Sequence, residues 1–348
     1  MKAKFLISMF RKRLQILFIL SDFFQKAKLL PYFKYIKVVI IILFYLPAGV
    51  YAQEYTKSFG VAGERIVVDQ NGRRIPVEKK FLRIISLYGA HTENLFALGL
   101  NKEIIGVSRH EVFPSEAMKK AVFSYHDDPE KFLAVNPDLV LIRPMIDRGY
   151  PDLMARLEKS GITVASLQPG TLDDMFNYWM ALGILAGKQK EASEMISGFK
   201  ESVSVFKSLT KTVGRKKRVY FEAIHSKMKT FSPNSMAIFA LETAGGINIA
   251  NDAKSVRGTN IAAYGKERIL SKACAIDVYL AQSGAMNRPT ISLIKKEPGF
   301  KVIKAIKENK IYIIDEMIVS RPTLRLLNGI QKIGKILYPD VFSLAVSY

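Results

Sequence analysis

Residues 83–110 read RIISLYGAHTENLFALGLNKEIIGVSRH, and this stretch decides the fold class of the chain. The apolar run 84–87 is followed by a helix-like segment over 92–98, which Gly99 ends, and a second apolar run covers 104–107. This order predicts a strand, a helix and a second strand parallel to the first. Polar and cationic residues follow both strands, and ligands bind outside the carboxyl ends of the strands in open parallel sheets. The segment therefore predicts one half of a binding cleft.

The same alternation of short apolar strands and helices fills two halves of the chain. Up to residue 170 it predicts a three-layer α/β lobe with a mainly parallel sheet, preceded by a hairpin around Asn71-Gly72. A continuous helical pattern covers 188–212, and about 25 residues of helix span about 40 Å. A second lobe of the same class restarts with a strand over 218–224. We predict two α/β lobes joined by a single long rigid helix.

The first 52 residues have the pattern of an export signal. They hold nine Lys or Arg and one Asp, which supplies +8 of the formal net charge of +21. An apolar run over 38–46 is shorter than the about 20 residues of a membrane span. Small residues ending at Ala52 predict cleavage there and a periplasmic protein, whereas an uncleaved segment would tether it to the membrane. The predicted division is a signal peptide with an N-terminal extension over 1–52, lobes over 53–170 and 214–348, and a helical region with the connector over 171–213.

Composition excludes several classes of function. The remaining +13 of charge is spread over a long, mixed-sign sequence without a basic patch interleaved with aromatics, so we expect no nucleic-acid binding. The one cysteine, Cys274, allows no intrachain disulfide and no Cys-ligated iron–sulfur cluster, and its apolar surroundings in sequence predict a buried, inert thiol. We find no phosphate-cradling glycine loop, nucleophile elbow or paired-carboxylate motif. The chain is therefore predicted to be no enzyme and to carry no intrinsic cofactor.

Histidines and arginines cluster after predicted strands. All four histidines do so, and His91 and His225 are the two favoured as cleft residues or metal ligands, although none has the i, i+4 pairing of a helix-borne zinc site. Arginine binds carboxylates and phosphates bidentately, so the arginines at strand ends favour an anionic ligand, with a surface ion pair as the alternative for each. Glu222 is open to a ligand contact or an ion pair, and Tyr264 to a cleft wall or packing. The candidate ligand-binding residues are His91, Arg109, His110, Arg143, Glu222, His225, Tyr264 and Arg321.

A short internal repeat supports the two lobes. Residues 129–140, PEKFLAVNPDLV, are similar to residues 266–278, KERILSKACAIDV. In each, a Glu opens a short helix and an Asp opens a buried strand.

Together these motifs resemble the class III periplasmic substrate-binding proteins of ABC importers, the iron–siderophore, haem and cobalamin group of the helical-backbone metal receptor superfamily. The resemblance covers about residues 64–342. It rests on the opening segment and on the order and spacing of VVDQNGRRIPV, PEKFLAVNPDLVLI, LEKSGITVASLQPGTLDDM, LETAGGINIA, KENKIYIID and LYPDVF. The family often has Pro or Ser where this chain has Gly89-Ala90-His91, in a loop that faces the cleft.

The resemblance implies a ligand held between two lobes with little hinge motion. It also implies that Glu130 and Glu267 dock on arginines of the membrane permease. We therefore expect a monomeric periplasmic protein that delivers an anionic iron complex, such as a ferric siderophore, or a related tetrapyrrole to an ABC permease and its ATPase. Two alternatives are a receptor for a bare metal ion or an oxyanion such as molybdate, and a periplasmic metal-linked enzyme or chelatase that uses Glu222 and the histidines.

Overall fold

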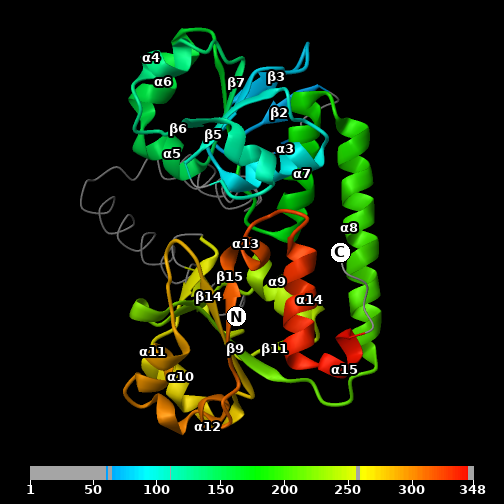
Figure 1. Cartoon of the computed structure of the whole chain (residues 1–348), viewed down its shortest axis with the longest axis vertical. Helices are drawn as coiled ribbons and strands as arrows, with labels where there is room; N and C mark the ends of the chain where they lie inside the picture. The colour runs from blue at the N-terminus through cyan, green and yellow to red at the C-terminus, as the bar shows by residue number, and fades with distance from the viewer. Residues whose placement is uncertain (1–59, 62–64, 110, 256–258, 344–348) are drawn as a thin grey trace, which may run out of the picture. The chain divides into compact units, whose positions relative to one another are not determined.

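The computed structural model describes residues 60–61, 65–109, 111–255 and 259–343 (Figure 1). The predicted signal over 1–52 and the candidate His110 lie outside these residues. The first lobe contains a five-stranded sheet in which all neighbouring strands are parallel, as the sequence predicts. The order across this sheet is β6 (Ala121–Phe123), β5 (Ile104–Ser108), β4 (Ile84–Ser86), β7 (Leu139–Ile142) and β8 (Thr163–Ser166).

The predicted hairpin forms a separate antiparallel sheet. Its strands are β1 (Gly60–Val61), β2 (Ile66–Val68) and β3 (Arg74–Pro76). Gly72 takes a φ of 82°, which glycine adopts without a steric cost. Asp69 is fully buried, and its Oδ1 accepts the backbone N–H groups of Asn71 and Arg73 at 2.9 and 2.8 Å. This side chain fixes the turn that the Asn-Gly pair predicts.

The second lobe contains a mixed sheet. β9 (Arg218–Ile224), β14 (Val278–Ser283) and β15 (Ile311–Asp315) are parallel, and β11 (Ile247–Asn248) adds to β9 in parallel. β10 (Lys229–Phe231), β13 (Ile261–Ala263) and β12 (Lys254–Ser255) extend the sheet with antiparallel pairing from the side of β9 opposite to β14, which is also the side that β11 joins. Sequence reasoning finds β9, β14 and β15, which are apolar runs. It misses β10, β11, β12 and β13, which have two or three residues each and are too short to show a period.

Helices carry the chain from one lobe to the other. α7 (Leu172–Ala186) begins at a capping box between Thr171 and Asp174, and Gly187 ends it with a φ of 66°. α8 (Gln189–Lys211) then runs for 23 residues, about 35 Å at the rise of an α-helix, as the connector prediction requires. It ends shortly before β9 begins the second sheet.

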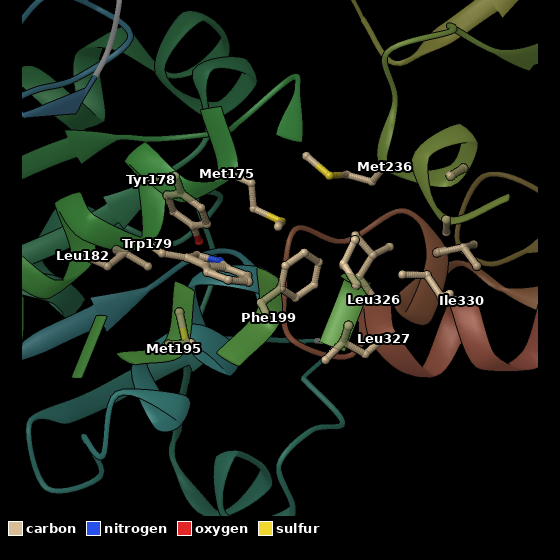
Figure 2. Packing of buried hydrophobic residues seen from close by; sticks show 14 of the residues in the cluster. Met175, Tyr178, Trp179, Leu182, Met195, Phe199, Met236, Leu326, Leu327 and Ile330 are labelled. Atoms are coloured by element: carbon tan, nitrogen blue, oxygen red, sulfur yellow. The ribbon is translucent and has the colours of Figure 1, made fainter. Parts of the chain in front are cut away.

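Side chains from elements of both lobes share one apolar core. Trp179 of α7 and Phe199 of α8 are buried with ring centroids 5.3 Å apart, in an edge-to-face arrangement. Met236 of α9 (Met236–Thr243) and Leu326 and Ile330 of α14 (Leu326–Leu337) belong to the same cluster (Figure 2). Because interiors are closely packed, such a shared core opposes large relative motion of these elements.

The internal repeat corresponds to the same structural unit in each lobe. α4 (Pro129–Leu133) precedes β7, and α10 (Lys266–Ser271) precedes β14. Asp138 accepts the backbone N–H of Arg83 at 2.9 Å, just before β4, and Asp277 accepts that of Arg218 at 3.0 Å, at the start of β9. Each Asp therefore fixes the start of the neighbouring parallel strand.

One expectation is wrong: Cys274, predicted to be buried, is exposed, because it lies in the 3-10 turn Ala273–Ala275 before β14. Near the end of the chain, α14 begins only at Leu326, and the Pro322 carbonyl before it accepts hydrogen bonds from Asn94 and Trp179. Ile303 takes an extended conformation between the 3-10 turn Phe300–Val302 and α12 (Lys304–Lys307). The other helices are α3 (Gly89–Ala97), α5 (Pro144–Gly149), α6 (Pro151–Lys159), α11 (Ile291–Lys296), α13 (Glu316–Val319) and α15 (Pro339–Phe342).

Candidate functional site

A tyrosine and an arginine meet at the carboxyl edge of the first sheet. Tyr88 follows β4 and Arg143 follows β7, its neighbour in the sheet. The guanidinium carbon of Arg143 lies 4.6 Å from the centroid of the Tyr88 ring, within the range of a cation–π interaction. Among the described residues no group hydrogen-bonds the buried Nε of Arg143. This edge therefore offers an aromatic face and a cation with spare donor capacity.

His91 lies beside Tyr88 but is an interior residue. It has no exposed area, and the two ring centroids are 5.1 Å apart. Its Nδ1 lies 2.7 Å from the Tyr178 hydroxyl, and its Nε2 lies 3.1 Å from the Ile142 carbonyl oxygen. Burial lowers the pKa of His91 to about 3, so the ring is neutral at physiological pH. Both nitrogens are engaged by the protein, which gives His91 a positioning role under the loop that follows β4.

Arg321 joins the same group from the second lobe. Its Nη1 lies 2.9 Å from Oε1 of Glu93 on α3, and Nη1 of Arg325 lies 3.4 Å from the same oxygen. The Glu93 side chain is only 2% exposed, and burial raises its pKa against the opposing effect of the two arginines. Asn94 Nδ2 and Trp179 Nε1 both donate to the carbonyl oxygen of Pro322 at 3.0 Å. The segment that starts at Arg321 is thus fastened to the first lobe by ion pairs and hydrogen bonds.

A second buried carboxylate faces this arginine. Glu111 is 7% exposed, accepts a hydrogen bond from the Ser108 hydroxyl, and has its pKa raised by burial. A Cβ on Gly89 would lie 2.7 Å from Arg321 Cζ and 2.9 Å from Glu111 Oε2. Only glycine leaves room for the guanidinium at the start of α3. Sequence reasoning missed Glu93 and Glu111, because nothing in their spacing shows that two arginines more than 200 residues away would face them.

An aromatic group lies after β6, the edge strand of the same sheet. The rings of Tyr125 and Tyr150 have centroids 4.8 Å apart, and the Tyr150 hydroxyl lies 3.0 Å from Nδ1 of the exposed His126. Arg109, which follows β5, is exposed and helps to lower the pKa of Asp127, where the hydrogen bond from Lys131 is the larger cause. The first sheet thus presents aromatic rings and cations at the ends of β4, β5, β6 and β7.

Glu222 and His225 form a separate, buried pair in the second lobe. Glu222 has no exposed area, and its Oε2 lies 2.8 Å from Nδ1 of His225 and accepts the Tyr279 hydroxyl. The hydrogen bond to Glu222 raises the pKa of His225, whose Nε2 lies 3.6 Å from Glu297. His225 therefore lies between two carboxylates, and Glu222 contacts this side chain and the Tyr279 hydroxyl inside the lobe.

Tyr264 also packs inside the second lobe. It is 6% exposed, and its hydroxyl donates to Oδ1 of Asp252 at 3.1 Å. The guanidinium carbon of Arg268 lies 4.3 Å from the ring centroid. Burial raises the pKa of this phenol. These contacts give Tyr264 the packing role that the sequence left open.

The two glutamates of the internal repeat are exposed. Glu130 lies in the first turn of α4 with a side chain 69% exposed, and its Oε1 lies 3.5 Å from Nη2 of Arg156. Glu267 is exposed in the first turn of α10. The structure therefore presents both carboxylates to solvent at equivalent places of the two lobes.

Within the described ranges, no group of three or more His, Cys, Asp or Glu side chains could hold a metal ion. No helix in the part of the chain that the structure describes is long and apolar enough to cross a membrane.

Comparison with known proteins places these features in a wider group. A family model described as periplasmic binding protein matches residues 84–317. The uncharacterized ABC transporter substrate-binding lipoprotein YvrC of Bacillus subtilis is 24% identical over 297 residues, which cover 84% of this chain and 90% of that protein. The vitamin B12-binding protein of Vibrio parahaemolyticus is 25% identical over 259 residues, 73% of this chain and 87% of the other. The crystal structure of a possible iron-binding (periplasmic solute-binding) protein from Staphylococcus epidermidis matches with a TM-score of 0.65 and 26% identity, over 75% of this chain and 100% of that one.

Proposed function

Because the chain belongs to the periplasmic binding protein family, we propose that it captures a metal held in an organic complex and delivers it to the permease of an ABC importer. The ligand classes are a ferric siderophore, a haem or a corrinoid. The observation that carries the proposal is the carboxyl edge of the first sheet, where Tyr88 and Arg143 lie in cation–π contact. Tyr125, His126 and Tyr150 add further rings after a strand of the same sheet.

This arrangement suits a large organic complex better than a bare ion. Aromatic side chains supply flat apolar faces with polar tips, which match macrocycles and the aromatic or amide parts of iron chelators. Arg143 and Arg109 supply donors for an anionic group on such a ligand. The names of the relatives, which refer to vitamin B12 and to iron, support the same classes. The described residues hold no cluster suited to a bare metal ion, which weakens the alternative of a metal-ion receptor.

Family membership makes the chain a binding protein and not an enzyme, so the chelatase alternative is set aside. Glu222 and His225, which that alternative would use, hydrogen-bond each other in the interior of the second lobe. The substrate is therefore expected to leave the protein chemically unchanged.

The ligand class is tested on protein purified from its own periplasm. An absorption spectrum and elemental analysis should show iron or cobalt together with the visible band of a haem, corrinoid or ferric siderophore. Molybdenum without such a band would favour an oxyanion receptor. A colourless, metal-free protein that also binds haemin, cyanocobalamin and ferrichrome no better than serum albumin would refute the proposal.

Glu130 and Glu267 are proposed to dock on the permease, since both are exposed at equivalent positions. Charge complementarity at such sites governs association rate and register. Glu130→Lys and Glu267→Lys should each leave ligand affinity intact and reduce uptake by cells strongly. Glu201→Lys, on an exposed position of α8, is the matched control and should leave uptake unchanged. Loss of ligand affinity in either docking variant would show that the residue lies in the ligand site.

Export is proposed to depend on residues 1–52. Mass spectrometry of the periplasmic protein should find Gln53 as its first residue. A start nearer the initiator Met1 would instead indicate an uncleaved membrane tether.

A further inference from the structure

Carboxylates lie beside arginines near the carboxyl edge of the first sheet, although the whole chain carries a formal net charge of +21. Arg321 and Arg325 both contact one oxygen of Glu93, and Glu111 lies against the same place at the start of α3. The electrostatic environment of Tyr88 includes Arg143, Arg321, Glu93 and Glu316. Arg321, which the sequence predicts to bind an anionic ligand, thus lies beside a carboxylate in the folded chain, as does Arg325.

The carboxylates of Glu93 and Glu111 are buried and do not lie on the protein surface. The side chain of Glu93 is 2% exposed, and Glu111 is 7% exposed. Within the described chain, Oε2 of Glu93 and Oε2 of Glu111 have no hydrogen-bond partner. Burial raises the pKa of both carboxyl groups, whereas Arg321 lowers it and so favours their charged forms. Burying an oxygen without a partner is costly, and this cost together with the nearby arginine favours a use for negative charge at this place.

The arginines are correspondingly held in place. Gly89 leaves the space that the Arg321 guanidinium occupies, and the next residue, Pro322, is bound by Asn94 and Trp179. Arg325 lies over the ring of Phe113, with its guanidinium carbon 4.6 Å from the centroid. Neither arginine can turn fully toward a ligand without giving up its contact with Glu93.

We infer that Glu93 and Glu111 are specificity residues that set the charge of the ligand, favouring a metal complex with few anionic groups over a polyanionic one. The inference rests on the proposed function and names a property of its ligand. Arg143 and the exposed Arg109 would still pair with one or two anionic groups. A polyanionic complex would bring further negative charge against the two buried carboxylates, which is discrimination by repulsion.

Matched pairs of ligands that differ in charge test this inference in the full chain. The pairs are haemin dimethyl ester with haemin, cyanocobalamin with its tricarboxylic acid derivative, and ferrichrome with ferric enterobactin. For the pair that binds, the wild-type protein should prefer the less anionic member. The double variant Glu93→Gln with Glu111→Gln should reduce that preference by about tenfold, the effect of removing like charge at close range in a partly screened site.

Two controls separate charge from structure. Glu201→Gln removes the same charge from an exposed position of α8 and should leave the preference unchanged. Glu111→Gln alone carries the test if the double variant is unstable, because no arginine lies within ion-pair distance of Glu111 in the described structure. A wild-type preference for the more anionic member, or an equal preference in wild type and variants, would overturn the inference and leave the proposed function intact. Failure of every pair to bind to any of these proteins would overturn the proposed function and the inference with it.

Discussion

Gly89→Ala tests the contact between the lobes with one added carbon atom. The new Cβ would lie 2.7 Å from Arg321 Cζ and 2.9 Å from Glu111 Oε2, both too close for real atoms. The atoms in the way belong to the ends of long side chains, so we expect the backbone to stay and the guanidinium to move. The 2.9 Å contact between Arg321 Nη1 and Glu93 Oε1 is then lost, while Glu93 keeps its 3.4 Å contact with Arg325.

The magnitude follows from the contact that is lost. A hydrogen bond to a charged group contributes about 1.5–3 kcal/mol, and both partners are largely buried here. Replacing glycine by alanine restricts the unfolded chain, which by itself raises the free energy of unfolding by about 0.4–1 kcal/mol. We therefore expect the free energy of unfolding to fall by about 1–2 kcal/mol.

Urea denaturation followed by circular dichroism measures this change. Gly198→Ala is the matched control, because a Cβ there meets nothing within 4 Å on α8, and it should stabilise by about 0.5–1 kcal/mol. In an Arg321→Ala background the Gly89→Ala change should cost much less, since the guanidinium is already gone and only the Glu111 carboxylate has to shift. An equal cost in both backgrounds, or a stabilisation like that of the control, would refute the reasoning.

Three further predictions concern titration and accessibility. The pKa of His225 is raised in the folded protein, so the pairing of His225 with Glu222 stabilises the fold below about pH 6.5. This stabilisation is lost as the pH rises through the folded pKa. In Glu222→Gln, thermal unfolding measured across this pH range should show a smaller loss of stability. His91 has a folded pKa of about 3, so below pH 6.5 the unfolded chain binds a proton that the folded protein does not. The free energy of unfolding should therefore fall by up to about 1.4 kcal/mol per pH unit as the pH drops from 6.5 toward 3. The fall should be smaller in His91→Gln. A slope that is the same in the wild type and in Glu222→Gln, or in the wild type and in His91→Gln, would contradict the corresponding assignment. Cys274 is exposed, so Ellman's reagent should titrate one thiol in the native protein, whereas no reaction before unfolding would show that it is buried.

The sequence predicts the framework well because the framework depends on local patterns. Parallel strands are short apolar runs, and the connector is a long segment with regular apolar spacing and no proline, so both can be read from periodicity. α7 lies at the start of the helical region predicted over 171–213, where Thr171 and Gly187 are strong start and stop signals. The antiparallel strands β10, β12 and β13 escape prediction, because pairing with distant partners and not their own composition defines them.

The site is less predictable, because its chemistry depends on contacts between distant parts of the chain. A histidine after a strand looks the same in sequence whether it faces a ligand or, like His91, the interior. The position of Arg321 after β15 predicts that it lies near the end of a strand. Its pairing with Glu93 cannot be predicted in the same way, because the two residues are 228 positions apart in the sequence. Glu222 and His225 are only three residues apart, but their hydrogen bond depends on a turn of the chain that the sequence pattern does not predict.

The internal repeat separates what the two lobes share from what distinguishes them. Both lobes use an Asp to fix the start of a neighbouring strand, and both place an exposed Glu in the first turn of the preceding helix. The features that the two lobes share therefore belong to the framework and to the proposed docking on the permease. Both of these require the same local geometry in each lobe. The strand ends differ: the first lobe has Tyr88 and Arg143 there, whereas in the second the end of β9 passes directly to the buried His225. We therefore propose that the differing strand ends, together with the carboxylates beside Arg321, decide which ligand the protein binds.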